Sequence, residues 1–141
     1  MSNKRLLNPS SGNASFGAVP EARSRSVLIP AGSIYLSQGR HIGPNRGFGA
    51  RHIWAEHPDE MRDAGFASEE FVPHFVAQII KAGTPLYFEG HFSAKTRLIA
   101  VRGAPGLAIL ELRYREDEAF WSIVTAYRAN KKHGVRIGTV L

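Results

Sequence analysis

The chain has no cysteine among its 141 residues. This absence excludes disulfide bonds, a thiol nucleophile and zinc sites built from thiolates. It leaves the cellular compartment open, because a secreted domain can fold without disulfides.

Long apolar runs are also missing. No stretch approaches the roughly 20 apolar residues of a membrane-spanning helix. The first five residues, MSNKR, lead into no continuous apolar segment, so the sequence predicts no signal peptide. We therefore expect no membrane insertion, and an exported form would depend on another segment or another protein.

Acidic residues are the scarcer charged group. The chain has 12 of them against 18 lysines and arginines, which gives a net charge of +6 and a pI near 10.1. A basic surface attracts polyanions, and nucleic acid is the commonest soluble one. A charge that serves only solubility is the alternative. Hydrophobic residues make up 43% of the chain, which is enough for the core of one domain.

Residues 1–26 are rich in Ser, Asn, Gly, Pro and Arg and show neither a helical nor a strand period. This composition predicts a flexible linker or arm, followed by a single domain at residues 27–141. A frayed terminus of that same domain is the alternative.

Short strands or extended segments are expected at 27–30 and 33–36, and after them the pattern predicts helices first and a sheet second. Helices are expected at 49–56, from Pro58 onward and from Ser68 to Lys81, after a loop at 38–49. The period then changes to two, which predicts strands at 86–89, 96–102, 107–115 and 119–127. The expected fold class is α+β, with N-terminal helices packed on a roughly four-stranded antiparallel sheet.

Two histidines lie close together in the segment 47–57, behind a glycine-rich turn. His52 and His57 are five residues apart, which corresponds to about 140° of helical rotation and not to the HExxH spacing of a zinc site. With no clear third ligand, the sequence predicts no metal. Arg51 and Glu56 beside the histidines favour a catalytic role, and histidines that serve only packing are the alternative.

The last long strand carries two hydroxyl groups. Strict alternation places Thr125 and Tyr127 on one face, together with Trp121. With Arg97 or Arg113 from neighbouring strands, this face could bind phosphate. An ordinary solvent-exposed sheet face is the alternative, because Thr, Arg and Tyr are common there.

These residue types suit cleavage of RNA. The reaction needs a base for the 2′-hydroxyl proton, an acid for the leaving 5′-oxygen, and groups that stabilise the phosphorane. Histidine titrates near 6.5 and can fill either proton-transfer role, so no cofactor is required. The residues expected to bind RNA, through stacking or charge, are Arg51, Trp54, Lys95 and Trp121.

The same residues resemble a known group of nucleases. The Gly47–Gly49 turn, His52-Ile53 and His57, and the strand sequence WSIVTAY at 121–127 resemble the barnase/EndoU/colicin/RelE-type ribonucleases over about residues 27–128. The similarity is greatest to versions from phage proteins and from the C-termini of contact-dependent toxins. It implies a helical layer on a four-stranded antiparallel sheet and a metal-independent ribonuclease often aimed at tRNA. It also implies a tightly binding immunity protein, commonly acidic.

Carried over residue by residue, the resemblance implies a catalytic set of His52, His57, Arg97, Arg113, Thr125 and Tyr127. The lysine of the family has no secure counterpart, because Lys95 lies in an expected loop, and the general acid is therefore left open. The resemblance also implies an effector domain that is secreted or delivered and acts in the cytoplasm of a target cell.

Two other functions are compatible with the sequence. One is a non-catalytic, basic module that binds nucleic acid. The other is a toxin with different chemistry, such as ADP-ribosyl transfer, for which the acidic segment 115–118 is the only feature. That segment equally fits a solvated hairpin loop.

Overall fold

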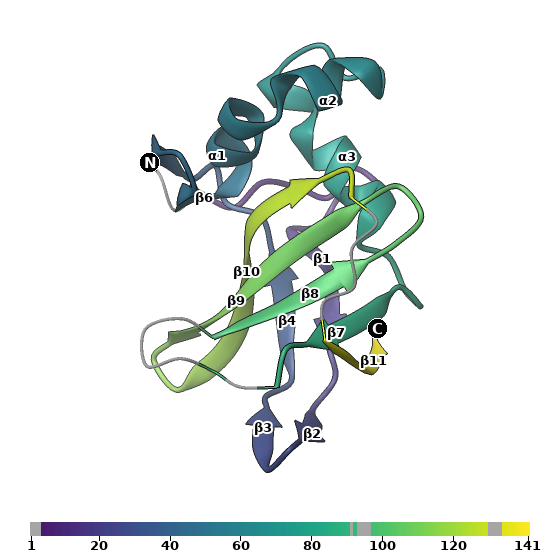
Figure 1. Ribbon diagram of the computed structural model, residues 1–141. Coiled ribbons are helices and arrows are strands. Elements are labelled where there is room, and N and C mark those ends of the chain that lie inside the picture. The colour runs from purple at the N-terminus through teal and green to yellow at the C-terminus, as the bar shows by residue number, and fades with distance from the viewer. Residues whose placement is uncertain (1–3, 91, 93–96, 130–133) are drawn as a thin grey trace.

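The structure is a computed structural model that describes residues 4–90, 92, 97–129 and 134–141. Short strands occupy the first third of the chain, helices the middle, and longer strands the remainder (Figure 1). In chain order the elements are β1 (Ser15–Val19), β2 (Ala22–Ser24), β3 (Val27–Ile29), β4 (Gly32–Tyr35), β5 (Arg40–Gly43), β6 (Arg46–Phe48), α1 (Gly49–Glu56), α2 (Pro58–Asp63), the 3₁₀ helix η1 (Glu69–Phe71), α3 (Val72–Ile79), β7 (Pro85–Phe88), β8 (Leu98–Arg102), β9 (Leu107–Arg115), β10 (Glu118–Tyr127) and β11 (Val135–Thr139).

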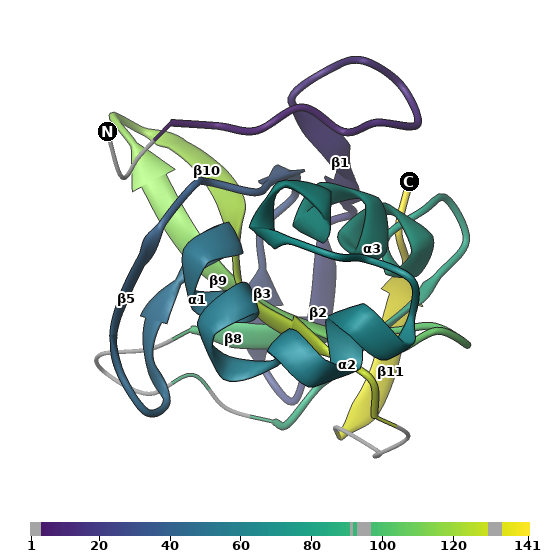
Figure 2. The same cartoon turned by 90° about the horizontal axis from the view of Figure 1, so that it is seen from above.

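The main sheet has seven strands in the order β1-β4-β10-β9-β8-β7-β11. Neighbouring strands are antiparallel except β4 and β10, which run parallel. The sheet curls around its inner face, and the helices lie over one end of it (Figures 1 and 2). The hairpins β2–β3 and β5–β6 form two separate small sheets.

The expected fold class is wrong in two respects. The sheet has seven strands rather than about four, and the helices follow six strands rather than opening the domain. The short segments expected at 27–30 and 33–36 match β3 and β4, and the strands missed in the first 48 residues are β1, β2, β5 and β6, which are three to five residues long. A period of two is hard to distinguish from a loop over so few residues, especially where glycine and serine are frequent.

The expected linker at residues 1–26 instead contributes to the domain from Lys4 onward. The amide of Leu6 donates to the carbonyl of Leu36 at 2.8 Å, and strand β1 pairs with β4. Phe16 and Val19 of β1 are buried in the core. Burying side chains of this size contributes about 1.5–3 kcal/mol each, which fixes the segment in place.

The helices begin and end close to where the sequence placed them. Helix α1 spans Gly49–Glu56 as predicted, and Pro58 occupies the first turn of α2, where its missing N–H costs nothing. In α3, Phe75, Val76 and Ile79 face the core. None of the helices in the described part of the chain is long and apolar enough to cross a membrane.

A bulge in β10 decides which side chains reach the outer face of the sheet. The register with β9 shifts between Ile123 and Thr125, so that Val124 is an extra residue. Trp121 and Ile123 before the bulge, and Ala126 after it, are all fully buried in the core.

The bulge thus reverses the alternation that the sequence predicted. Thr125 lies on the face opposite Trp121, not on the same face. Ser122 lies between the inward-pointing Trp121 and Ile123 and therefore points outward. Tyr127 is two residues after Thr125 and shares its face, so Ser122, Thr125 and Tyr127 all belong to this outer face. We use the name outer face for this side of β9 and β10 below.

Candidate functional site

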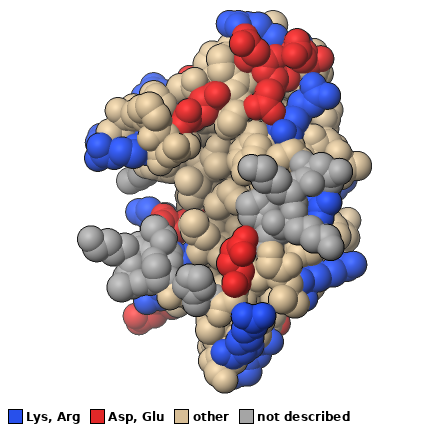
Figure 3. All heavy atoms as spheres, viewed as in Figure 1, with Lys and Arg blue, Asp and Glu red and all other residues tan. Residues whose placement is uncertain are grey.

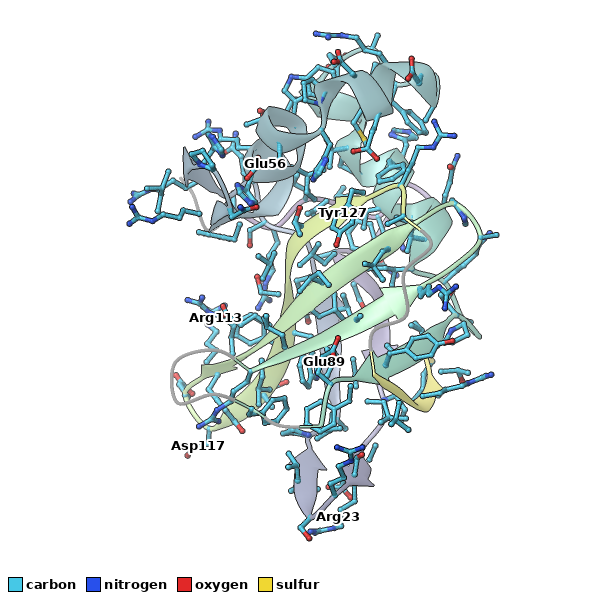
Figure 4. All side chains as sticks on the ribbon, viewed as in Figure 1. Arg23, Glu56, Glu89, Arg113, Asp117 and Tyr127 are labelled. Atoms are coloured by element: carbon cyan, nitrogen blue, oxygen red, sulfur yellow. The ribbon has the colours of Figure 1, made fainter. Side chains whose placement is uncertain are left out.

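Polar and titratable side chains gather where α1 and the hairpin β5–β6 meet the C-terminal end of β10. Helix α1 contacts both β10 and β5. Figure 4 shows Glu56 on α1 above the end of β10, where Tyr127 lies. The three elements come from separate parts of the chain, so the site exists only in the folded domain.

The centre of the site is a pair of histidines. The Nδ1 atoms of His41 and His52 are 3.0 Å apart, and the two rings stack with centroids 5.3 Å apart. His41 is exposed on β5, whereas His52 on α1 is only 3% exposed. At this distance one Nδ1 donates and the other accepts, so the protonation of one ring sets that of the other.

Gly47 on β6 allows this pair to form. Its φ is +142°, and a Cβ at this position would lie 2.8 Å from Nδ1 of His52 and 2.3 Å from the carbonyl oxygen of Arg40. Only glycine leaves room for the hairpin to approach the helix this closely. The glycine-rich turn that the sequence analysis singled out therefore has a packing role beside the histidines.

Glu56 lies on the other side of His52. Its Oε1 is 3.7 Å from Nε2 of His52, and the same oxygen accepts a hydrogen bond from the amide of Asn45. Burial lowers the pKa of His52 below its ordinary value of 6.5; the nearby His41 and His57 lower it further, and Glu56 opposes the shift. The His52 ring is therefore neutral at neutral pH.

A second group ties the helices to β10. Nδ1 of His57 is 2.6 Å from Oε2 of Glu60, and the other carboxylate oxygen of Glu60 accepts from the amide of Arg128 at 2.9 Å. The His57 ring stacks on Tyr127 with centroids 5.1 Å apart. Because Pro58 starts α2 immediately after His57, this histidine sits at the junction of two helices and a strand.

Two hydroxyl-bearing residues, Thr125 and Tyr127, lie at this end of the outer face. Burial raises the pKa of Tyr127, and the carboxylate of Glu60 raises it further, so the phenol stays protonated and can donate. Thr125 Oγ1 is buried and has no hydrogen-bond partner among the described residues. Leaving a buried hydroxyl without a hydrogen bond lowers the stability of the folded state by about 1–3 kcal/mol, so this hydroxyl does not stabilise the fold.

The residues expected to bind RNA do not gather here. Trp121 is fully buried and its Nε1 donates to the carbonyl of Pro30 at 3.1 Å, so the expected stacking on a base is incompatible with the fold. Trp54 is partly buried against the core, with the Arg62 guanidinium 5.4 Å from its ring. Arg51 is exposed on α1. Lys95 lies outside the described residues.

The two arginines expected at the reacting phosphate lie elsewhere. Arg113 pairs with Phe120 in β10, seven residues before Tyr127, which at about 3.3 Å per residue is roughly 23 Å away along the strand. Its guanidinium is 3.1 Å from Glu111. Arg97 is exposed and precedes β8, with its carbonyl bonded to the amide of Leu112. The structure does not bring these side chains to His57 and Tyr127.

His41 is the site residue that the expected catalytic set lacked. It belongs to a segment expected to be a loop, which the structure shows as the hairpin β5–β6. The turn residues Pro44 and Asn45 and the following Gly47 are typical of such a hairpin. A hairpin centred there pairs His41 with Gly47 and so carries it to α1.

One cluster here has the atom types of a metal site. Ligand-type atoms of His41, His52 and Glu56 all lie within 4.8 Å of one another. Two imidazoles and a carboxylate are donors that zinc accepts, with the fourth position open in catalytic sites. The sequence predicted no metal, and this cluster is the feature that a chelation experiment must address.

Among the residues that the structure describes, positive charge is not concentrated in one patch on the face that bears Tyr127. Figure 3 shows lysine and arginine side chains around the margins of this face, with acidic side chains gathered at its helical end. The net charge of +6 therefore does not by itself define an RNA site.

Comparison with known proteins assigns no family. The chain matches no protein-family model and no curated protein. The resemblance to barnase/EndoU/colicin/RelE-type ribonucleases stays a prediction, as do an acidic immunity protein and delivery into a target cell. The chemistry of the site is therefore the basis of the function proposed below.

The lowered pKa of His52 predicts a loss of stability in weak acid. Below 6.5 the unfolded chain binds a proton at His52 that the folded chain does not, so unfolding becomes more favourable as the pH falls toward the folded-state pKa. The variant His52→Asn lacks this proton. Urea titrations from about pH 8 to about pH 5 should show the parent losing more unfolding free energy than the variant. An equal loss in both proteins would contradict this assignment.

Proposed function

We propose that the protein is a metal-independent endoribonuclease in which His41 exchanges a proton with the RNA. The observation that carries this proposal is the 3.0 Å contact between Nδ1 of His41 and Nδ1 of His52, with Glu56 on the far side of His52. His41 is exposed and can meet a substrate, whereas the buried His52 acts through it as a positioning residue.

The three side chains fix one another's protons. The negative charge of Glu56, 3.7 Å from Nε2 of His52, favours the neutral tautomer that carries its proton on Nε2 and leaves the lone pair on Nδ1. Nδ1 of His41 must then donate to it. This leaves the lone pair of His41 on Nε2, where the ring can act as a general base.

The reaction follows from that tautomer. His41 takes the proton of the RNA 2′-hydroxyl, whose oxygen then bonds to the adjacent phosphorus while the bond from phosphorus to the 5′-oxygen breaks. In its protonated form, His57 gives the proton on Nε2 to the leaving 5′-oxygen, because its Nδ1 is bonded to Glu60. The Tyr127 phenol donates to a phosphorane oxygen, whereas the buried Thr125 hydroxyl lies too deep to reach the substrate. The products are a 2′,3′-cyclic phosphate and a 5′-hydroxyl end.

Chelation tests this proposal directly. Incubation of the protein with total tRNA should give discrete fragments on a denaturing gel at the same rate with and without EDTA, because every proton-transfer group belongs to the chain. The fragments should carry cyclic phosphate and 5′-hydroxyl ends. A DNA oligonucleotide of matching sequence is the control and should stay intact, since it lacks the 2′-hydroxyl.

The cluster of His41, His52 and Glu56 makes a metal-dependent phosphodiesterase the second candidate. Loss of cleavage in EDTA and its return on adding zinc or manganese would replace the first proposal with this one. Intact RNA under all conditions, bound in a salt-dependent way, would instead favour the non-catalytic binding module.

ADP-ribosyl transfer gains no support from the fold. The acidic residues Glu116 and Asp117 form the exposed turn between β9 and β10, as expected of a solvated hairpin loop. They lie at the end of the sheet away from Tyr127 (Figure 4). No titratable side chain of the histidine site is in this turn.

A further inference from the structure

A hollow of about 480 Å³ lies between the start of α1 and the outer face of β9 and β10. Its volume falls in the range of roughly 300–1,000 Å³ that is typical of small-ligand sites. Positive and aromatic side chains meet in it, and the residues that matter below are Arg5, Arg113, Arg115, Phe48, Phe120 and Ser122.

Arg5 is held in a fixed position at this hollow. Its backbone forms a β-bridge with Ser37, and its guanidinium lies 3.6 Å from the ring centre of Tyr35 and 5.1 Å from that of Phe120. A guanidinium stacked on two rings loses little further freedom when it binds an anion. The N-terminal segment therefore brings an ordered cation to the outer face.

The hollow and the histidine site both lie along strand β10. The bulge at Val124 places Ser122 of the hollow on the same face as Thr125 and Tyr127. On the other side, Phe48 of the hollow directly precedes α1, which carries His52. A chain that leaves the reacting phosphate can thus follow β10 toward Arg113 without crossing the core.

Acidic side chains limit where phosphate can bind. A neighbouring hollow of about 360 Å³ shares Arg5, Arg115 and Phe120 but is also lined by Glu116 and Glu118. Carboxylates repel phosphate, so the second hollow is the less favourable one. Glu111 already pairs with Arg113 at 3.1 Å, and a phosphate at Arg113 must compete with it.

We propose that the first hollow binds a nucleotide of single-stranded RNA farther along the RNA chain from the cleaved phosphate. Arg113 and Arg115 bind the phosphate, and the aromatic wall of Phe48 and Phe120 contacts the base. Cations beside aromatic rings are the common means of binding single strands. This subsite rests on the proposed ribonuclease function, because it extends the site of that reaction.

Binding of an RNA that cannot be cleaved tests the subsite separately from catalysis. The probe is a fluorescent, single-stranded 2′-O-methyl oligonucleotide, followed by anisotropy at several salt concentrations. The double variant R113A/R115A should bind roughly tenfold more weakly than the parent, and the slope of log affinity against log salt should fall by roughly 0.7 for the one lost phosphate contact.

A matched double variant controls for net charge. R23A/R136A also removes two exposed arginines, but from β2 and β11 rather than from the hollow. It should bind the probe like the parent, and thermal unfolding of both double variants should match the parent. Equal weakening in the two double variants would show that only net charge matters and would overturn the subsite. A parent protein that does not bind the probe would also overturn it.

The two proposals can fail independently. If the parent cleaves tRNA but R113A/R115A binds the probe normally, the subsite is wrong and the ribonuclease stands. If the parent binds the probe through Arg113 and Arg115 but cleaves no RNA, the hollow is an RNA site of a non-catalytic module, and the reaction at His41 is wrong.

Discussion

Cleavage of tRNA by the His41→Ala protein is expected to fall by roughly 10²–10⁴-fold, the range for losing a general acid or base. The reason is the position of this ring. His41 is exposed on β5 and is bonded at 3.0 Å to His52, which leaves its Nε2 as the atom that can reach the 2′-hydroxyl. Because the side chain is exposed, its removal should leave the unfolding temperature close to that of the parent.

The measurement is a single-turnover time course on labelled tRNA, which isolates the chemical step from product release. His74→Ala is the matched control, since His74 is an exposed histidine on α3 and is not part of the histidine site. The control should cleave at the parental rate. Parental activity in His41→Ala would remove His41 from the reaction and return the role of base to His52 or His57.

The pH profile of the same reaction separates positioning from structure. Glu56→Gln keeps the size of the side chain but can present an N–H to His52, which weakens the preference for one tautomer. The variant should lower kcat with little change in KM and should move the acidic limb of the profile. A purely structural Glu56, which also accepts from Asn45, would leave the shape of the profile unchanged.

The local elements near the site were predictable, because each has its own signals. Gly49 and Pro58 bound the first helix, and the alternation in 107–115 and 119–127 matches β9 and β10 closely. These signals act between residues close together in the chain. They gave His57, Thr125 and Tyr127 as candidates, and the structure brings these three to one end of β10.

The arrangement of the elements was not predictable in the same way. The parallel pairing of β4 with β10 places Ile34 beside Trp121, although most of the chain separates them. Nothing in the sequence of either segment indicates which strand it pairs with. The long-range pairing fills out a core that two short early strands could not have formed alone. This is why the sheet has seven strands although the longer, regular segments numbered only four.

Two errors at the site have a single-residue origin. Alternation in the sequence cannot reveal a bulge. Because Val124 is an extra residue, the prediction placed Trp121 on the same face as Thr125 and Tyr127, whereas Trp121 points into the core. His41 was left out of the catalytic set because its partner, His52, is eleven residues away and is reached only through the hairpin. Both errors concern geometry that forms on folding.

Trp121 provides the second large expected effect, on stability. Replacing it with alanine should lower the free energy of unfolding by about 3–5 kcal/mol, the usual range for an aromatic ring removed from a core. The ring is fully buried, and its Nε1–H bond to the carbonyl of Pro30 spans 91 residues of sequence. A loss of this size is a large part of the 5–15 kcal/mol typical of a domain.

Urea unfolding of Trp121→Ala, Trp121→Phe and Leu28→Ala gives the measurement and its controls. Phenylalanine keeps most of the packing but leaves the Pro30 carbonyl unpaired, so its cost should be about 1–3 kcal/mol. Leu28 is 43% exposed on β3, and its removal should cost about 0.5 kcal/mol or less. If Trp121→Ala were as stable as the parent but bound RNA poorly, the ring would face the substrate, and the bulge could not be where the structure places it.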